Sequence, residues 1–173
     1  MSISAPVSGA YWLYLGSGPR REGDLASHVA RLGGAPVVNI DTKVGGYDHD
    51  LTYSPVRVEV LRLAQSERCL GALVSIPCKT FSVLRGKPGV EHSKPVRDLD
   101  NVLGIPREDG TLPHAVVQSN LMSELAAGVM AAVHSNGGVF VAESPPSRAA
   151  GSRFPIEGRE RHASQFDHPS WLG

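Results

Sequence analysis

The chain has 173 residues, the size of one ordinary domain and long enough to bury a hydrophobic core. Its 41% hydrophobic and 20% charged residues are typical of a folded globular protein. Because 17 basic residues balance 17 acidic ones, the net charge gives no overall attraction to nucleic acid or to a membrane. No apolar run approaches the roughly 20 residues of a membrane span, and the first ten residues lack a signal-peptide pattern.

The chain has two cysteines, too few for a disulfide scaffold. Cys69 and Cys78 lie at opposite ends of one predicted strand, roughly 30 Å apart if that strand is extended. This separation exceeds the reach of a disulfide. We therefore expect free thiols and an intracellular, reducing compartment, either cytoplasm or nucleus.

Apolar runs bounded by turn residues predict strands, and apolar residues at helical spacing predict helices. In chain order the pattern predicts strand 10–18, helix 23–33, strand 35–42, helix 54–68, strand 69–77, loop 79–113, helix 114–138 and strand 139–147. Strands that alternate with helices and are nearly all apolar indicate an α/β fold with a parallel sheet covered on both faces. We expect one domain, with its core at 11–147 and an irregular polar tail at 148–173.

Ligands of such folds bind at the carboxyl ends of the strands. Four places qualify here: residues 16–19, Asp41, Cys78 and Glu143. The glycines at 16 and 18 let the backbone turn tightly and approach a ligand, although many strand ends use glycine only to turn. An acidic residue at the position of Asp41 commonly binds ribose hydroxyls. Together these features favour a nucleoside-containing cofactor.

Cys78 follows Pro77 at a predicted strand end and precedes Lys79, so we expect its thiol to be accessible. A neighbouring cation and free loop amides favour the thiolate, whereas most buried cysteines are inert. A phosphatase loop is excluded because Leu84 stands where that loop needs arginine, and no metal-ligand spacing occurs. A thiol and the Glu143 carboxylate on neighbouring strand ends suit covalent catalysis on a heteroaromatic ring.

Four motifs in order resemble the DNA (cytosine-5) methyltransferase family over about residues 11–147. IPCKTFSVLRGK resembles the Pro-Pro-Cys-x-x-Phe-Ser loop, and YLGSG resembles the Phe-x-Gly-x-Gly cofactor turn. YDHDLT stands where the family has Gly-Asp-Ile. The segment SNLMSELAAGVMAAVHSNGGVFVAES resembles the helix and strand that lead to the family's Glu-Asn-Val.

The resemblance implies a Rossmann-like methyltransferase fold, S-adenosylmethionine as methyl donor and a flipped cytosine as substrate. It makes Cys78 the nucleophile that adds to carbon 6, and Glu143 the group that holds and protonates ring nitrogen 3. EGRER resembles the family's Gln-x-Arg-x-Arg, which adds Arg159 and Arg161 as contacts to the base or a nearby phosphate. The implied cofactor residues are Tyr14, Gly16, Ser17, Gly18, Asp41, Asp50, Pro77, Asn120 and Leu121. The implied contacts to nucleic acid are Lys79, Phe81, Ser82, Arg85 and Lys87.

Other cations of the loop, at Lys94, Arg97 and Arg107, are further candidates for phosphate contact, although a solvated loop would look similar. Two tail histidines, His162 and His168, are more readily read as part of a packed tail than as metal ligands.

The chain also departs from the family. Ile76 replaces the first proline of the cysteine loop, Ser144 and Pro145 replace Asn-Val, and Pro19 replaces a third glycine. The sequence ends where the target-recognition region would begin, so we expect a minimal or truncated member that acts on DNA rather than RNA. An adjoining domain or partner chain would then supply recognition. Two alternatives stay open: a binding module without turnover, and an enzyme that modifies a free nucleotide or RNA.

Overall fold

The structure, a computed structural model, describes residues 3–32, 34–82, 95–145, 149, 151, 153 and 161–172. The chain forms two compact units, and neither is continuous in sequence. The first consists of Met1–Ile76 with Glu124–Glu143, and the second of Pro77–Ser123 with Ser144–Gly173. The expectation of a single domain stays a prediction.

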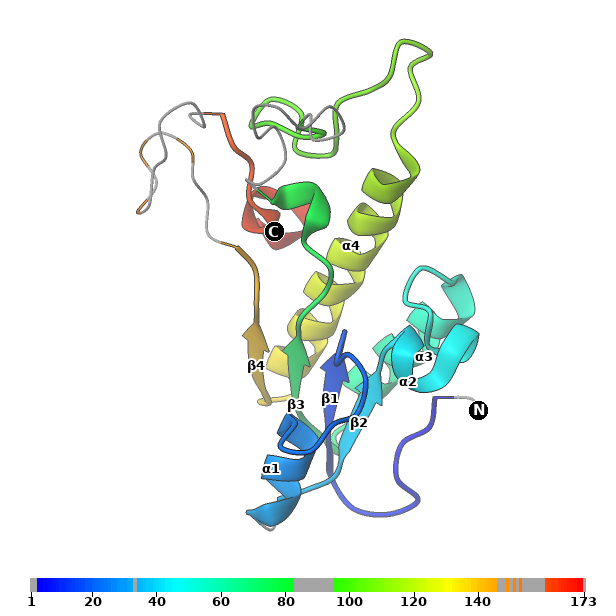
Figure 1. Ribbon diagram of the computed structural model, residues 1–173. Helices are drawn as coiled ribbons and strands as arrows, with labels where there is room; N and C mark the ends of the chain where they lie inside the picture. Colours follow the sequence, from blue (N-terminus) through cyan, green and yellow to red (C-terminus); the bar gives the residue numbers. More distant parts are fainter. Residues whose placement is uncertain are drawn as a thin grey trace. The chain divides into compact units, whose positions relative to one another are not determined.

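A four-stranded parallel sheet forms the centre of the first unit (Figure 1). Its strands are β1 (Tyr11–Leu15), β2 (Val37–Ile40), β3 (Cys69–Val74) and β4 (Val139–Ala142). They are ordered β2-β1-β3-β4, so β1 and β3 are central. This arrangement confirms the predicted α/β class and all four predicted strands.

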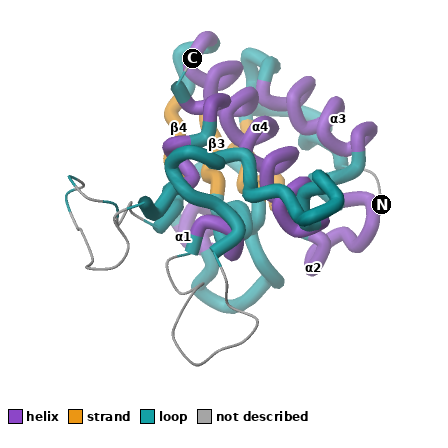
Figure 2. Tube along the Cα trace, turned by 90° about the horizontal axis from the view of Figure 1, so that it is seen from above, coloured by secondary structure: helices purple, strands orange, loops and turns teal. Residues whose placement is uncertain are grey.

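The helices are α1 (Leu25–Arg31), α2 (Thr42–Gly45), α3 (Ser54–Ala64) and α4 (His114–Ser135). The chain moves in one direction across the sheet from β1 to β2 and in the opposite direction from β2 to β3. Since crossovers between parallel strands are right-handed, helices of opposite crossovers lie on opposite faces. Accordingly, Figure 2 shows α1 on one face of the strands and both α3 and α4 on the other.

Helix α3 begins and packs as its sequence predicts. α3 begins at Ser54-Pro55, where proline's missing N–H is harmless, and buries Val56, Val60 and Leu63 on one face. The buried hydroxyl of Tyr11 in β1 donates a 2.9 Å hydrogen bond to the carbonyl of Leu63 and so ties the sheet to α3.

Helix α4 continues from the second unit into the first. By length and composition alone it could cross a membrane, and core helices of globular proteins pass the same test. Its buried residues repeat at helical spacing, as expected of a helix that packs on a core. They include Val116, Leu125, Ala126, Val129 and Val133.

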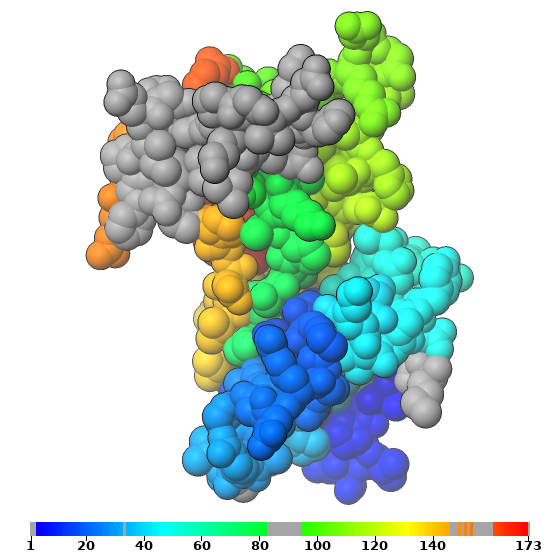
Figure 3. All heavy atoms as spheres, viewed as in Figure 1, coloured from blue at the N-terminus to red at the C-terminus, as the bar shows by residue number. Residues whose placement is uncertain are grey.

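Strand β4 differs from the expectation that the sheet is covered on both faces. Val139, Phe140 and Val141 are 62%, 40% and 54% exposed. In the described part of the chain β4 pairs only with β3, so it is an edge strand, and Figure 3 shows its gold segment at the surface. The prediction of a buried fourth strand was therefore wrong: an apolar run does not reveal whether a strand has a second neighbour.

In its described residues the second unit contains three short 3-10 helices in addition to the first half of α4. They are η2 (Lys79–Phe81), η3 (Gln165–Asp167) and η4 (Pro169–Trp171). Reciprocal bonds between Ser164 and Asp167 form a capping box that begins η3. The rings of Phe166 and Trp171 meet edge to face, 5.4 Å between centroids, so the tail is more ordered than its composition predicted.

Candidate functional site

The turn after β1 contains two glycines in the left-handed region, and each has a different reason for being glycine. Gly16 has a φ of +70°, and a Cβ there would lie 2.2 Å from the carbonyl oxygen of Ser75. Its N–H donates to the carbonyl of Ile40, 2.8 Å away. Gly16 is therefore required by the close approach of the backbone that follows β1 to the backbone that follows β3.

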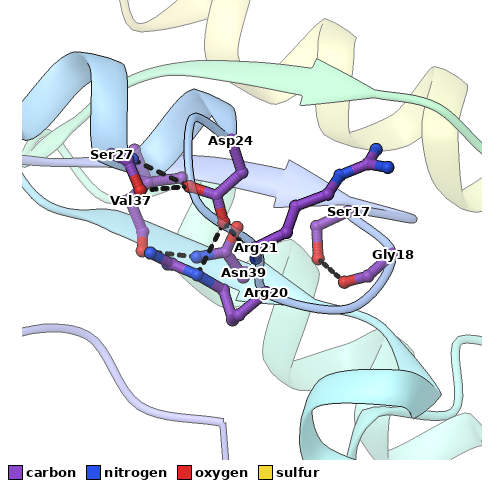
Figure 4. Close-up of polar contacts among 8 residues, drawn as sticks. All are labelled: Ser17, Gly18, Arg20, Arg21, Asp24, Ser27, Val37 and Asn39. Carbon is purple, nitrogen blue, oxygen red and sulfur yellow. Dashed lines mark hydrogen bonds and ion pairs between the residues drawn. The ribbon is translucent and has the colours of Figure 1, made fainter.

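Gly18 has a φ of +67°, but a Cβ there would meet no atom of the described residues within 4 Å. Its N–H donates a 3.0 Å hydrogen bond to Oδ2 of Asp41. The turn is thus open to a ligand at Gly18, while at Gly16 it is closed by the chain. Ser17 is half-buried between them, and its hydroxyl donates to the Gly18 carbonyl at 3.1 Å (Figure 4).

Asp41 joins the end of β2 to this turn. Oδ1 accepts the N–H of Lys43 at 2.7 Å and caps α2, while Oδ2 accepts the N–H of Gly18. A carboxylate has about four acceptor positions, so these two bonds leave capacity for ribose hydroxyls. The sequence did not predict the structural part of this role, and the ribose contact stays a prediction.

The far end of the turn is held by Asp24, the N-cap of α1. Its carboxylate accepts the N–H and hydroxyl of Ser27, both at 2.8 Å, and lies 2.8 Å from Nε of Arg20. These donors, the Ser27 N–H first among them, lower the pKa of Asp24 to about 2. In Figure 4 the Ser17–Gly18 end of the turn lies apart from this cluster, so the Asp24 carboxylate does not occupy the space beside Gly18.

Two other predicted cofactor residues lie in the first unit. Tyr14 is half-buried in β1, in register with Asn39 of β2. Oδ1 of Asp50 accepts the N–H and the hydroxyl of Thr52, at 2.9 and 2.7 Å. The room at Gly18 and the remaining acceptor positions of the half-buried Asp41 are the features that the ribose of an adenosyl ligand would need.

Three predicted cofactor residues lie in the second unit. Pro77 is exposed and Leu121 is half-buried. Nδ2 of Asn120 donates to the carbonyl of Leu103 at 2.9 Å, while its Oδ1 is buried and accepts no hydrogen bond among the described residues. An unsatisfied buried acceptor is costly, so this oxygen suits a ligand donor.

The two cysteines have different environments, and both are free thiols. Cys69 is buried in β3, and burial raises the pKa of its thiol. Cys78 is half-buried just before η2, with φ −95° and ψ 12°, in the sparsely allowed bridge region where many active-site residues lie. Its carbonyl accepts the N–H of Phe81 at 2.9 Å. Cys78 is therefore partly accessible, and its role as a nucleophile stays a prediction.

Glu143 follows β4 in the first unit and is exposed. Its N–H donates to the carbonyl of Val74 at 2.8 Å, and its Oε2 accepts the hydroxyl of Ser75 at 2.9 Å. Sequence reasoning missed Ser75 because its pairing with a carboxylate 68 residues away leaves no local signal. Cys78 belongs to the other unit, so the joint action of thiol and carboxylate stays a prediction.

The predicted nucleic-acid contacts have several outcomes. Lys79 is exposed and Ser82 half-buried, whereas Phe81 is only 2% exposed. Arg97 is 4% exposed with its guanidinium inside the second unit, so the prediction that it contacts phosphate is wrong. Arg107 is exposed. Four predicted contacts lie outside the described residues: Arg85, Lys87, Lys94 and Arg159.

Arg161 has two carboxylate partners. Its guanidinium pairs with Asp100 and lies 3.9 Å from Asp98, and its carbonyl accepts the N–H of Leu99. These carboxylates would compete with a phosphate or base for the guanidinium, so the predicted contact requires the pairs to open.

Comparison with known proteins provides no assignment: no family model, curated protein or solved structure matches this chain. In the described ranges no three His, Cys, Asp or Glu side chains group closely enough to hold a metal ion.

Proposed function

We propose that the chain is a Rossmann-like, S-adenosylmethionine-dependent methyltransferase domain that modifies carbon 5 of cytosine in nucleic acid. The observation that carries the proposal is the open turn at Gly18, hydrogen-bonded to Asp41, beside the point where the strand order reverses. In open parallel sheets the crevice at that reversal is where nucleotide-like ligands bind.

The cofactor half of the proposal depends on the first unit. β2 lies on one side of β1 and β3 on the other, so the connection that leaves β1 and the connection that leaves β3 lead to opposite faces of the sheet, at the carboxyl ends of these two neighbouring strands. Gly18 supplies room for the ligand and Asp41 supplies acceptors for ribose. When bound, S-adenosylmethionine would provide an electrophilic methyl group.

The chemical half depends on Cys78 and Glu143. In the proposed reaction the Cys78 thiolate adds to carbon 6 while the Glu143 carboxyl gives a proton to ring nitrogen 3. Carbon 5 then has the electron density to accept the methyl group, and S-adenosylhomocysteine would be the leaving group. Loss of the carbon 5 proton to a base and expulsion of the thiolate restore the ring double bond, and nitrogen 3 returns its proton to Glu143.

The net charge of the chain bears on how a nucleic-acid target would be recognised. The balanced charge gives no overall pull toward nucleic acid, so we propose that an adjoining domain or partner chain supplies target recognition, with DNA as the substrate. The free thiols are consistent with the proposed cytoplasmic or nuclear location.

Trapping with 5-fluorocytosine DNA tests the proposal. Fluorine at carbon 5 prevents proton removal, so the Cys78 adduct persists and is visible by mass spectrometry. The adduct should require S-adenosylmethionine, disappear in Cys78→Ser and survive in Cys69→Ser, the matched control. Cofactor binding without any adduct would instead support the binding module, and an adduct only with fluorinated RNA or a free nucleotide would support the other alternative.

A further inference from the structure

Arg97 is a buried cation of the second unit. It is 4% exposed and forms no ion pair with any described carboxylate. Its guanidinium lies 4.0 Å from the centroid of the Phe81 ring, which offers its negative face. Burial lowers the pKa of Arg97 to about 10, the sign of a desolvated charge.

An isolated buried charge is costly, and a well-packed apolar residue at the same place would avoid that cost. Natural sequences break such local rules mainly at functional sites. The question is therefore what a guanidinium provides at this position that an apolar side chain would not.

The guanidinium connects three segments of the unit. Nε donates to the Thr80 hydroxyl at 3.1 Å, one terminal nitrogen donates to the carbonyl of Val102, and the other donates to the carbonyl of Val116 on α4 at 3.2 Å. Thr80 in turn donates to the hydroxyl of Ser119 at 2.8 Å. A planar fork makes these bonds at once, whereas the ammonium of lysine does not reproduce their geometry.

Two of the groups that Arg97 contacts, Thr80 and Phe81, belong to η2, which begins directly after Cys78. The N–H of Phe81 closes the turn by donating to the carbonyl of Cys78. Arg97 thus contacts the side chain of Phe81, whose N–H bonds the Cys78 carbonyl, and the side chain of its neighbour Thr80.

We propose that Arg97 is a positioning residue that locks the turn bearing Cys78 and thereby sets the reactivity of its thiol. The geometric part of this inference is independent of the enzyme's reaction, while its consequence for methyl transfer rests on the proposed function. Releasing the fork should leave the unit folded but free the turn, so that the half-buried thiol is exposed more often.

The experiment measures alkylation of the two cysteines by iodoacetamide in the full chain, followed by mass spectrometry. Arg97→Lys keeps the charge but loses the fork. We expect its Cys78 to react about tenfold faster, as for the loss of one charged hydrogen bond, about 1.4 kcal/mol. Cys69, buried in β3, should react as slowly as in the parent chain and reports any unfolding of the first unit.

Two further variants separate positioning from general destabilisation. Thr80→Val removes the hydroxyl that Arg97 bonds, so it should also speed Cys78, and the double variant should add little to Arg97→Lys. Val116→Ala leaves a cavity in the same unit but keeps every Arg97 bond, so its Cys78 should react as in the parent chain. An unchanged Cys78 rate in Arg97→Lys, or an equal rise in Val116→Ala, would overturn the inference.

A second readout concerns catalysis. If the parent chain transfers methyl groups, Arg97→Lys should lower kcat at least tenfold and leave the affinity for S-adenosylmethionine unchanged. A parent chain without methyl transfer would contradict the proposed function, whereas the alkylation rates would still decide the role of Arg97.

Discussion

The two glycines of the turn after β1 should respond very differently to the same substitution. Gly16→Ala and Gly18→Ala both place a side chain in the left-handed region, at φ of +70° and +67°. Only the first creates a steric conflict, because its Cβ would lie 2.2 Å from the Ser75 carbonyl oxygen, whereas ordinary contacts are 3.4–4 Å. The pair therefore separates backbone strain from chain packing.

The left-handed strain costs about 1–2 kcal/mol, partly offset by about 0.4–1 kcal/mol from the smaller entropy of the unfolded chain. Gly18→Ala should therefore lower the free energy of unfolding by about 1 kcal/mol. In Gly16→Ala the sheet must also open by roughly 1 Å at Ser75, an overpacking effect that adds about 1–3 kcal/mol. The difference between the variants is the quantity predicted.

Tryptophan fluorescence during urea unfolding measures this difference. Trp12 lies in β1 and Trp171 in the second unit, so a Trp171→Phe background leaves Trp12 as the reporter of the first unit. Gly16→Ala should show the lower midpoint, with the slope unchanged. Equal midpoints for the two variants would refute the close packing of the turn against the backbone after β3.

Three more predictions follow from single contacts. Asp24→Ala should lower the free energy of unfolding at pH 7. Because the folded-state pKa of Asp24 is lowered to about 2, the difference in this free energy between variant and parent chain should shrink as pH falls from about 4 through 2. A difference that stays constant in unfolding measured across this pH range would contradict the cap. Tyr11→Phe should lower the free energy of unfolding in urea by about 1 kcal/mol, because it removes the bond from a buried hydroxyl to the Leu63 carbonyl, which keeps the N–H of Ser66 as its other donor; an unchanged free energy would contradict a contribution of this bond. Ser75→Ala should slow methyl transfer without changing cofactor affinity, since it removes the hydroxyl that orients Glu143; an unchanged rate in a steady-state assay would remove Ser75 from the mechanism.

The alternation of apolar runs and helical spacing predicted the sheet well, because the central strands β1 and β3 are apolar and bury most of their residues. The same signature misled at β4, whose exposure depends on how many strands follow it in the sheet. Helix α2 was missed because residues 42–49 contain Gly45 and Gly46 and lack an apolar period, while its cap is supplied by Asp41.

The sequence predicts residues of the candidate site only where they directly follow a strand. The glycine turn, Asp41 and Glu143 follow strands, so a strand prediction locates them at once. The sequence offers Arg97 as a candidate phosphate contact because composition alone does not distinguish a solvated cation from one buried over an aromatic ring. Its hydrogen-bond partners lie up to 19 residues away, in η2, in the loop before α4 and in α4 itself, so no local pattern connects them to Arg97.

The central claim is that the open turn at Gly18 binds an adenosyl cofactor, and calorimetric titration of the purified chain with S-adenosylmethionine and S-adenosylhomocysteine tests it most directly. We expect saturable binding of both ligands at micromolar affinity, weakened at least tenfold in Asp41→Ala and unchanged in Cys78→Ser. Absence of binding, or binding that Asp41→Ala leaves unchanged, would contradict it.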